Sequence, residues 1–235
     1  MAAANTTRWI GIGLLGLPLY GALTFYSSVD PQPDPNTYYE AWSQYVTTNH
    51  YVLSHVLASG LGLILAIFGT FALGAYLATS RAGRLGLVAM VITVFGSALF
   101  LMPMGVSTFT APKTGQAYLA GIEEYSQLPS ILADTVGSVT SLLVIPLLLV
   151  GNVLLGVAIW RSRTLPRWAG VLWAAAPVFM YPLGLVYAVF VTGSTPPTVL
   201  VGALLIVISG GWIAWSVLRR PSVETVGVAA QPRVQ

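Results

Sequence analysis

Six long apolar stretches constrain the fold of this chain of 235 residues more than any other feature. A helix that crosses a bilayer needs about 20 mainly apolar residues, and each stretch is long enough. Only 7% of the residues are charged, whereas a soluble domain carries about 25%. We therefore predict an all-α, six-helix polytopic membrane bundle, with spans at Trp9 to Ser28, Tyr51 to Thr79, Leu85 to about Gly105, about Ser130 to Trp160, Trp168 to Thr192, and Val199 to Leu218.

The few charges are sorted by side in the six-span topology. Only Lys113 lies on one side, and nine arginines lie on the other: Arg8, Arg81, Arg84, Arg161, Arg163, Arg167, Arg219, Arg220 and Arg233. The positive-inside rule then predicts that both termini are cytoplasmic. Residues 1–220 are expected to form a single transmembrane domain, and residues 221–235 a disordered cytoplasmic tail. This distribution explains the basic balance without a nucleic-acid partner.

Span two carries a stripe of small side chains at four-residue spacing. Small residues let helix backbones approach closely in a membrane, so we expect span two to be a central helix. The stripe consists of Ser54, Ala58, Gly62, Ala66, Thr70, Gly74 and Ala78.

The arginine turns after spans two and four resemble each other. Ser80-Arg81 begins six residues beyond Gly74, and Ser162-Arg163 begins six residues beyond Gly156. This echo suggests a tandem hairpin repeat of spans two-three and four-five. The alternative is that short arginine turns between spans resemble one another.

Aromatic residues gather in the outer loops. Thr37 and Glu40 fit a capping box, which predicts a helix start. Tyr38, Trp42 and Tyr45 follow at helical spacing and are the predicted ligand-binding face of a short interfacial helix. In the second outer loop, Tyr118, Ile122 and Tyr125 have a similar pattern. The two helices would either cover a cavity between the spans or only anchor the loops.

Ionisable residues near the outer surface are the predicted acid/base groups. Counting along spans two and four places His55 and Asp134 at similar depth, and Glu123 and Glu124 lie in the nearby loop. Ser138 and Ser141 extend this group as predicted ligand-binding residues. The alternative for His55 is an interfacial histidine bonded to a neighbour. Deeper in span four, we expect Asn152 to bond to a neighbouring helix.

A metal site has few available ligands, because the chain contains no cysteine. His50, His55, Met102 and Met104 lie near the outer face, and imidazole with thioether ligands suits copper or haem. His50 and His55 are five residues apart and do not share a face of a regular helix. We predict no cofactor, with haem or copper as the alternative.

The turn from Arg161 to Gly170, with the sequence RSRTLPRWAG, resembles one found in small multi-pass membrane proteins of actinobacteria and other bacteria. Those proteins have no established function. The resemblance covers spans four and five and implies a bacterial inner-membrane protein. It implies no site residue.

No acidic or basic residue lies at mid-membrane depth, which argues against ion-coupled pumps and voltage sensors. We therefore expect a small-ligand-binding, permease-like or accessory membrane subunit with a polar outer-face cavity. The first alternative is a membrane-embedded enzyme that acts on a lipid or isoprenoid through acid/base chemistry. The second is a haem or copper protein. The expected partners are the bilayer, a lipid or isoprenoid-like ligand, and a membrane protein or second copy.

Overall fold

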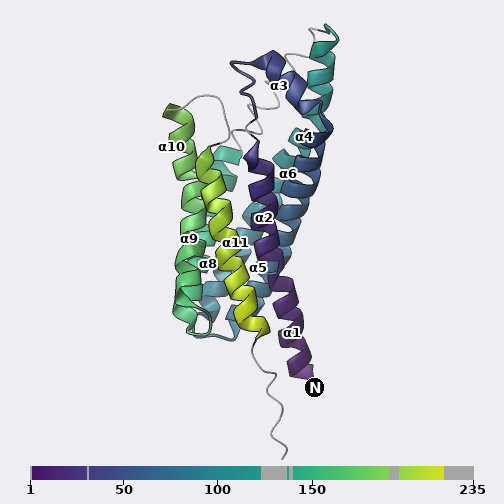
Figure 1. The fold of residues 1–235 in the computed structure, drawn as a ribbon. Coiled ribbons are helices and arrows are strands. Elements are labelled where there is room, and N and C mark those ends of the chain that lie inside the picture. The colour runs from purple at the N-terminus through teal and green to yellow at the C-terminus, as the bar shows by residue number, and fades with distance from the viewer. Residues whose placement is uncertain (1, 31, 123–136, 138–139, 191–195, 220–235) are drawn as a thin grey trace, which may run out of the picture.

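The computed structural model describes residues 2–30, 32–122, 137, 140–190 and 196–219. These residues form helices joined by short connections (Figure 1). In chain order the helices are α1 (Ala2–Leu14), α2 (Gly16–Val29), α3 (Tyr39–Val46), α4 (Asn49–Leu53), the π-helix η1 (Ser54–Leu61), α5 (Gly62–Ala78), α6 (Gly83–Leu119), the π-helix η3 (Thr140–Val144), α8 (Ile145–Ser162), α9 (Arg167–Met180), α10 (Pro182–Phe190) and α11 (Pro197–Leu218).

The all-helical fold and six membrane-spanning helices are confirmed for the described residues, whereas the predicted start of span four at about Ser130 and the predicted tail 221–235 lie outside them. Six helices are long and apolar enough to cross a membrane, so the chain is a multi-pass membrane protein. They run over Arg8–Val29, Asn49–Ala78, Gly83–Leu119, Leu142–Ser162, Arg167–Ala188 and Pro197–Leu218.

The third span is longer than predicted. Helix α6 has 37 residues, which at 1.5 Å each make about 55 Å, against about 30 Å for the hydrocarbon core. Pro103 and Pro112 lie inside it, although proline removes a backbone hydrogen bond. Because of its length, the helix extends beyond the hydrocarbon core. Tyr118, which was expected in a separate loop helix, lies near the end of α6.

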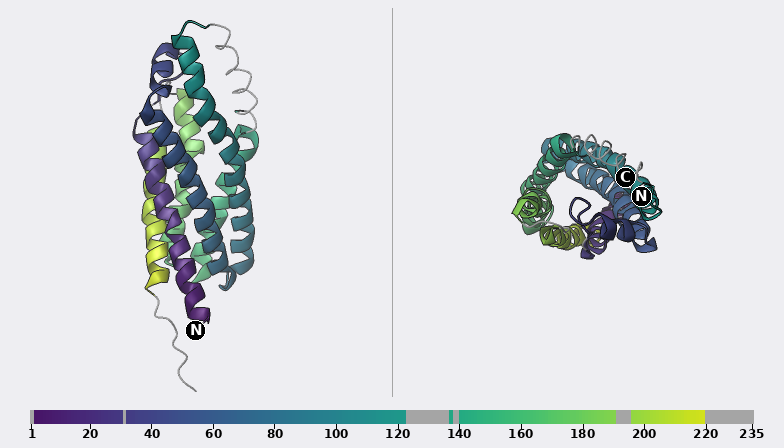
Figure 2. Two further views of the ribbon diagram at one scale, coloured as in Figure 1. Left: turned by 90° about the vertical axis from the view of Figure 1, so that its right-hand side faces the viewer. Right: turned by 90° about the horizontal axis from the view of Figure 1, so that it is seen from above.

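The spans form a ring in chain order. Helix α2 packs on α5, α5 on α6, α6 on α8, α8 on α9, α9 on α11, and α11 closes the ring on α2. The view from above in Figure 2 shows this closed arrangement. Span two is one wall of the ring, not its centre as expected, since Ile64 and Phe68 on its outer side are exposed.

The small-residue stripe faces the neighbouring helices. All its members except Ala78 are buried. A Cβ on Gly62 would lie 3.3 Å from Leu23 of α2, and a Cβ on Gly74 would overlap Met90 of α6. The stripe thus lets α5 approach helices on both sides of it.

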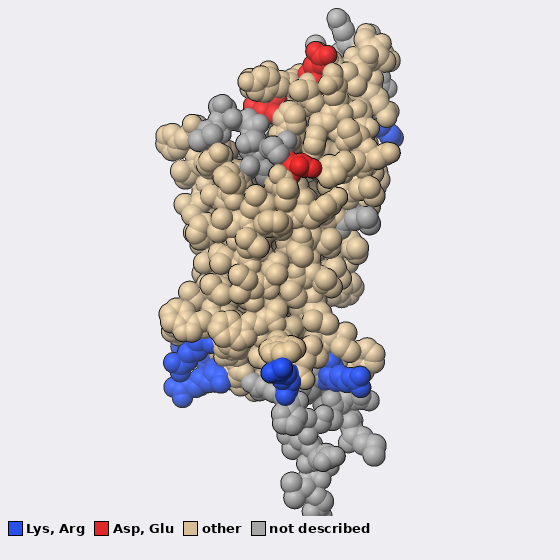
Figure 3. All heavy atoms as spheres, viewed as in Figure 1, with Lys and Arg blue, Asp and Glu red and all other residues tan. Residues whose placement is uncertain are grey.

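The two ends of the ring differ in charge. Figure 3 shows most of the Lys and Arg side chains on this face at the lower end, and the Asp and Glu side chains at the upper end together with one smaller basic patch. The lower end, called the arginine end below, holds the turns before α6 and α9, the start of α1 and the end of α11 (Figure 1). The main apolar core lies toward this end and includes Leu14, Leu73, Leu77, Leu155, Ile159, Ile213 and Val217.

Candidate functional site

Two aromatic residues between spans one and two, Tyr39 and the predicted Trp42, form a cluster against the extended end of α6. Tyr39 contacts Trp42 at 5.3 Å and Tyr118 at 4.7 Å between ring centroids. Gly115 of α6 makes this contact possible, because a Cβ there would lie 2.7 Å from Val46 of α3. Burial, with Tyr118 as a second cause, raises the pKa of Tyr39 above its ordinary value.

The buried face of α3 differs in register from the predicted one. Trp42 is buried and Tyr45 is half-buried, but Tyr38 is 61% exposed and lies just before the helix. The residues that face α6 include Tyr39, Trp42 and Val46. The predicted ligand-binding face of this helix is therefore used mainly to pack it on α6.

The predicted capping box is wrong. No side chain caps the start of α3, and the Thr37 hydroxyl donates to the Asp34 carboxylate at 3.0 Å. Asp34 also accepts from the backbone N–H of Asn36 at 3.0 Å. This backbone bond, with the Thr37 hydroxyl, holds the pKa of Asp34 below its ordinary value. A competing turn around Asp34 thus uses the hydroxyl that a cap would need.

His55 is held by its own helix and by an aromatic ring. Its Nδ1 lies 3.1 Å from the backbone oxygen of Tyr51, and its ring lies 3.9 Å from the Tyr51 ring. Tyr51 is fully buried, and its hydroxyl lies 3.1 Å from the Ser107 hydroxyl of α6. Tyr51 and Ser107 were not predicted site residues, and they connect span two with span three behind His55.

His50 has a different partner from His55. Its Nε2 lies 2.8 Å from the Asp30 carboxylate, and Tyr26 packs edge-on against the ring at 6.0 Å. This pair joins the end of span one to the start of span two. The predicted separation of the two histidines agrees with these different contacts.

The other predicted outer-face residues are brought together only in part. Met102 is 68% exposed on the surface of α6, and Met104 is half-buried. Within the described part of the chain, no group of three or more His, Asp or Glu residues could hold a metal ion. Glu123, Glu124, Asp134, Ser138 and the side chain of Ser141 lie outside the described residues. The His55–Asp134 pairing stays a prediction.

A polar cavity that was not predicted lies inside the ring. Its volume is about 20 Å³, and a water molecule needs about 10–15 Å³. Five of the six spans contribute its uncharged lining, which consists of Tyr20, Ala66, Thr70, Thr93, Ser97, Leu148, Asn152, Trp173 and Tyr181. The cavity therefore has room for a water molecule and offers hydrogen-bonding groups from several helices.

Two polar side chains of this cavity have no hydrogen-bond partner among the described residues. They are the Thr93 hydroxyl and the Trp173 indole N–H, each on a residue only 3% exposed. Asn152 donates to the Leu148 carbonyl of its own helix at 2.9 Å, not to a neighbouring helix as expected. Tyr20 and Tyr181 are hydrogen-bonded to each other across spans one and five.

The cavity lies near mid-depth. Counting 1.5 Å for each residue, Thr93 is about 15 Å along α6 from its start at the arginine end, and Asn152 is about 15 Å from the end of α8. The apolar core, which includes Leu73 and Leu155, packs between the cavity and the arginine end. A ligand in the cavity would thus be separated from that end by packed side chains.

The sequence contains a weak signal for this site. Thr93 and Ser97 are four residues apart on one helix, and Thr70 belongs to the small-residue stripe. Trp173 and Tyr181 resemble ordinary aromatic residues of a membrane helix. Comparison with protein-family models, curated proteins and solved structures found no match to this chain.

Proposed function

We propose that the protein is a permease-like, small-ligand-binding membrane protein whose site is the polar cavity inside the six-helix ring. One observation carries the proposal: Thr93 and Trp173, each with a buried polar group that has no hydrogen-bond partner among the described residues, both line a cavity formed by five spans. A buried polar group without a partner costs free energy, so a ligand that bonds to both would be stabilised there.

The lining favours a neutral ligand with hydrogen-bonding groups. The Trp173 indole N–H is a donor only, and the hydroxyls both donate and accept. No cavity residue is charged, and an ion at mid-membrane depth without a counter-charge would be strongly destabilised. Water matches both this chemistry and the cavity volume of about 20 Å³, whereas urea or glycerol match the chemistry but would need a wider cavity.

A break in span five supports a transport role. Helix α9 ends at Met180 and α10 begins at Pro182, so the interruption lies at Tyr181 in the cavity lining. The Tyr181 backbone N–H still donates to the Pro177 carbonyl at 2.9 Å. Pro177 and Pro182 have no backbone N–H to donate. Interrupted helices at mid-depth form the substrate sites of many transporters, because freed backbone groups can reach a ligand.

We also infer that the hairpins of spans two-three and four-five are a tandem repeat. The contacts support this inference: a Cβ on Gly74 would overlap Met90 across the first hairpin, and a Cβ on Gly156 would lie 2.6 Å from Ala174 across the second. A Cβ on Gly86 would lie 2.7 Å from Leu77, and one on Gly170 would lie 3.1 Å from Ile159.

The same proposal includes the orientation of the protein and the membrane in which it lies. The excess of arginine at one end supports a cytoplasmic position for that end and for both termini. The resemblance of the turn from Arg161 to Gly170 supports a bacterial inner membrane. A lipid-modifying enzyme and a haem or copper protein stay predictions. So does a role as a subunit with a membrane partner or a second copy.

Solute permeability of proteoliposomes tests the proposed function. We expect stopped-flow light scattering to detect faster entry of water, urea or glycerol than in protein-free liposomes. Asn152→Leu should slow that entry by about tenfold, the equivalent of one hydrogen bond of about 1.4 kcal/mol.

Thr108→Val is the matched control for this measurement. Thr108 is a buried hydroxyl residue of α6 outside the cavity lining, so its loss should leave the entry rate within about twofold. The permease proposal is wrong if all three solutes enter at the protein-free rate. Equal slowing by both variants would contradict the assignment of the site to the cavity.

A further inference from the structure

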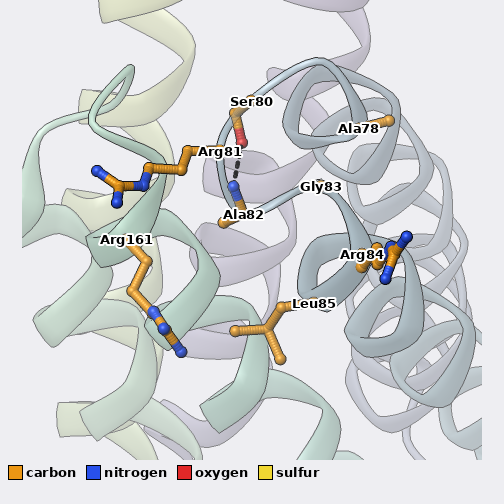
Figure 4. Close-up of a pocket in the computed structure, with 8 residues that line it drawn as sticks. All are labelled: Ala78, Ser80, Arg81, Ala82, Gly83, Arg84, Leu85 and Arg161. Carbon is orange, nitrogen blue, oxygen red and sulfur yellow. Dashed lines mark hydrogen bonds between the residues drawn. The ribbon is translucent and has the colours of Figure 1, made fainter.

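Three arginines line one pocket at the arginine end. The pocket has a volume of about 490 Å³ and is lined by Arg81 from the turn before α6, by Arg84 at the start of α6, and by Arg161 near the end of α8. Figure 4 shows Arg81 and Arg161 on one side of the turn and Arg84 on the other. Two separate parts of the chain thus supply positive charge to a single hollow.

These cations have no anionic partner in the described part of the chain. The ion pair found there is that of His50 with Asp30, at the other end of the bundle. All three arginine side chains are exposed, so their donors are available to a ligand. A guanidinium group presents several N–H donors in a plane, which suits the oxygens of a phosphate.

Apart from Ser80, the remaining lining is uncharged and without polar side chains. Ala78, Ala82 and Leu85 lie beside the arginines, and the Ser80 hydroxyl accepts from the Ala82 backbone N–H at 3.2 Å. Span two ends at Ala78 and span three begins at Gly83, so both spans run from this pocket directly into the apolar part of the bundle. A ligand here would meet cations and an apolar surface together.

We propose that this pocket binds a phosphoryl group, and that its source is the headgroup of an anionic phospholipid. Basic pockets between transmembrane helices are suited to such headgroups, because the phosphate meets the cations while the acyl chains stay in the bilayer. The pocket lies at the opposite side of the apolar core from the cavity, so this proposal does not rest on the proposed function.

Native mass spectrometry of the full chain in a neutral detergent tests this site. Phosphatidylglycerol is titrated against phosphatidylcholine, whose phosphate is neutralised by its choline. We expect the first lipid to bind in preference, and the double variant Arg81→Gln/Arg161→Gln to weaken it by about tenfold.

The double variant Arg8→Gln/Arg167→Gln is the matched control. It removes the same charge from exposed arginines of the same end that do not line the pocket, so phosphatidylglycerol binding should change less than about twofold. Thermal melting of both variants checks that the fold is intact. Equal weakening in the two variants, or unchanged binding in the pocket variant, would overturn the proposal.

Competition distinguishes the two sources of the phosphoryl group. Phosphatidylglycerol that stays bound in millimolar inorganic phosphate supports the lipid headgroup. Displacement by inorganic phosphate, but not by chloride at equal ionic strength, would support the phosphoryl site and overturn the lipid as its occupant. Displacement by both salts equally would contradict a specific site.

Discussion

At the scale of single residues, Thr93 and Trp173 distinguish the interior of this bundle from an ordinary apolar core. Both are almost fully buried, and neither the Thr93 hydroxyl nor the Trp173 N–H has a partner among the described residues. Thr108, on the same helix as Thr93, is also buried, but its hydroxyl donates to the Met104 carbonyl at 2.7 Å. Two threonines of one helix thus differ in whether their hydroxyl is satisfied.

This difference predicts opposite stability effects for the same substitution. Thr93→Val removes an unpaired buried hydroxyl at nearly constant volume and should stabilise the protein by about 1 kcal/mol. Thr108→Val removes a hydrogen bond and should destabilise it by about 0.5–1 kcal/mol. Thermal unfolding in detergent measures both.

Destabilisation by Thr93→Val equal to that by Thr108→Val would contradict the unpaired state of the Thr93 hydroxyl. We also expect the stabilised Thr93→Val variant to transport less, because the group it lacks is the one offered to the ligand.

At the scale of elements, the closest helix contact in the second hairpin is made by two glycines. A Cβ on Gly156 of α8 would lie 2.5 Å from the Gly170 backbone oxygen, and a Cβ on Gly170 of α9 would lie 2.5 Å from the Gly156 oxygen. Both obstacles are backbone atoms, which no side-chain rotation can move away. The two helices pack at this distance only because neither residue has a side chain.

Gly156→Ala should therefore separate α8 from α9 and destabilise the protein by about 2 kcal/mol. Gly211→Ala on α11 is the control, since a Cβ there has no atom within 4 Å. The control should be neutral or stabilising by up to about 1 kcal/mol, because alanine favours helix more than glycine. Comparable loss of thermal stability in both variants would contradict the close packing.

Element length and packing were predictable to different degrees. The stripe from Ser54 to Ala78 predicted close contacts of span two, because small side chains at four-residue spacing share a helix face. The length of α6 was not predictable, since Pro103 and Pro112 are helix breakers in isolation. Packing of α3 on the end of α6, through Val46 and Gly115, is a tertiary contact that the local sequence of α6 does not reveal.

At the scale of the whole molecule, the charges lie at two ends and the polar cavity lies between them. The arginine end holds exposed cations, the other end holds the acids and one smaller basic patch, and the face drawn between them is uncharged (Figure 3). In the described part of the chain, positive and negative charges are thus separated along the bundle axis. The positive-inside rule uses this separation across the membrane to predict orientation.

Sidedness can be measured with single cysteines, because the natural chain has none. We expect Asn36→Cys, in the first outer loop, to react with a membrane-impermeant maleimide in intact cells. Thr79→Cys, beside the turn before α6, should react only after the membrane is permeabilised. Both positions are exposed, so burial does not limit the reaction. The reverse pattern of labelling would refute the proposed orientation.

The sequence by itself determined that the chain is a six-span helical membrane protein, because span length and apolar composition depend only on local residues and on bilayer thickness. Only the tertiary structure decided that the spans close into a ring and that Tyr20, Thr93, Asn152 and Trp173 meet inside it. Hydropathy makes a residue suitable for the membrane but does not select which helix it faces. That choice depends on close contacts between helices, such as that of Gly156 with Gly170, which bring together residues that are distant in the sequence.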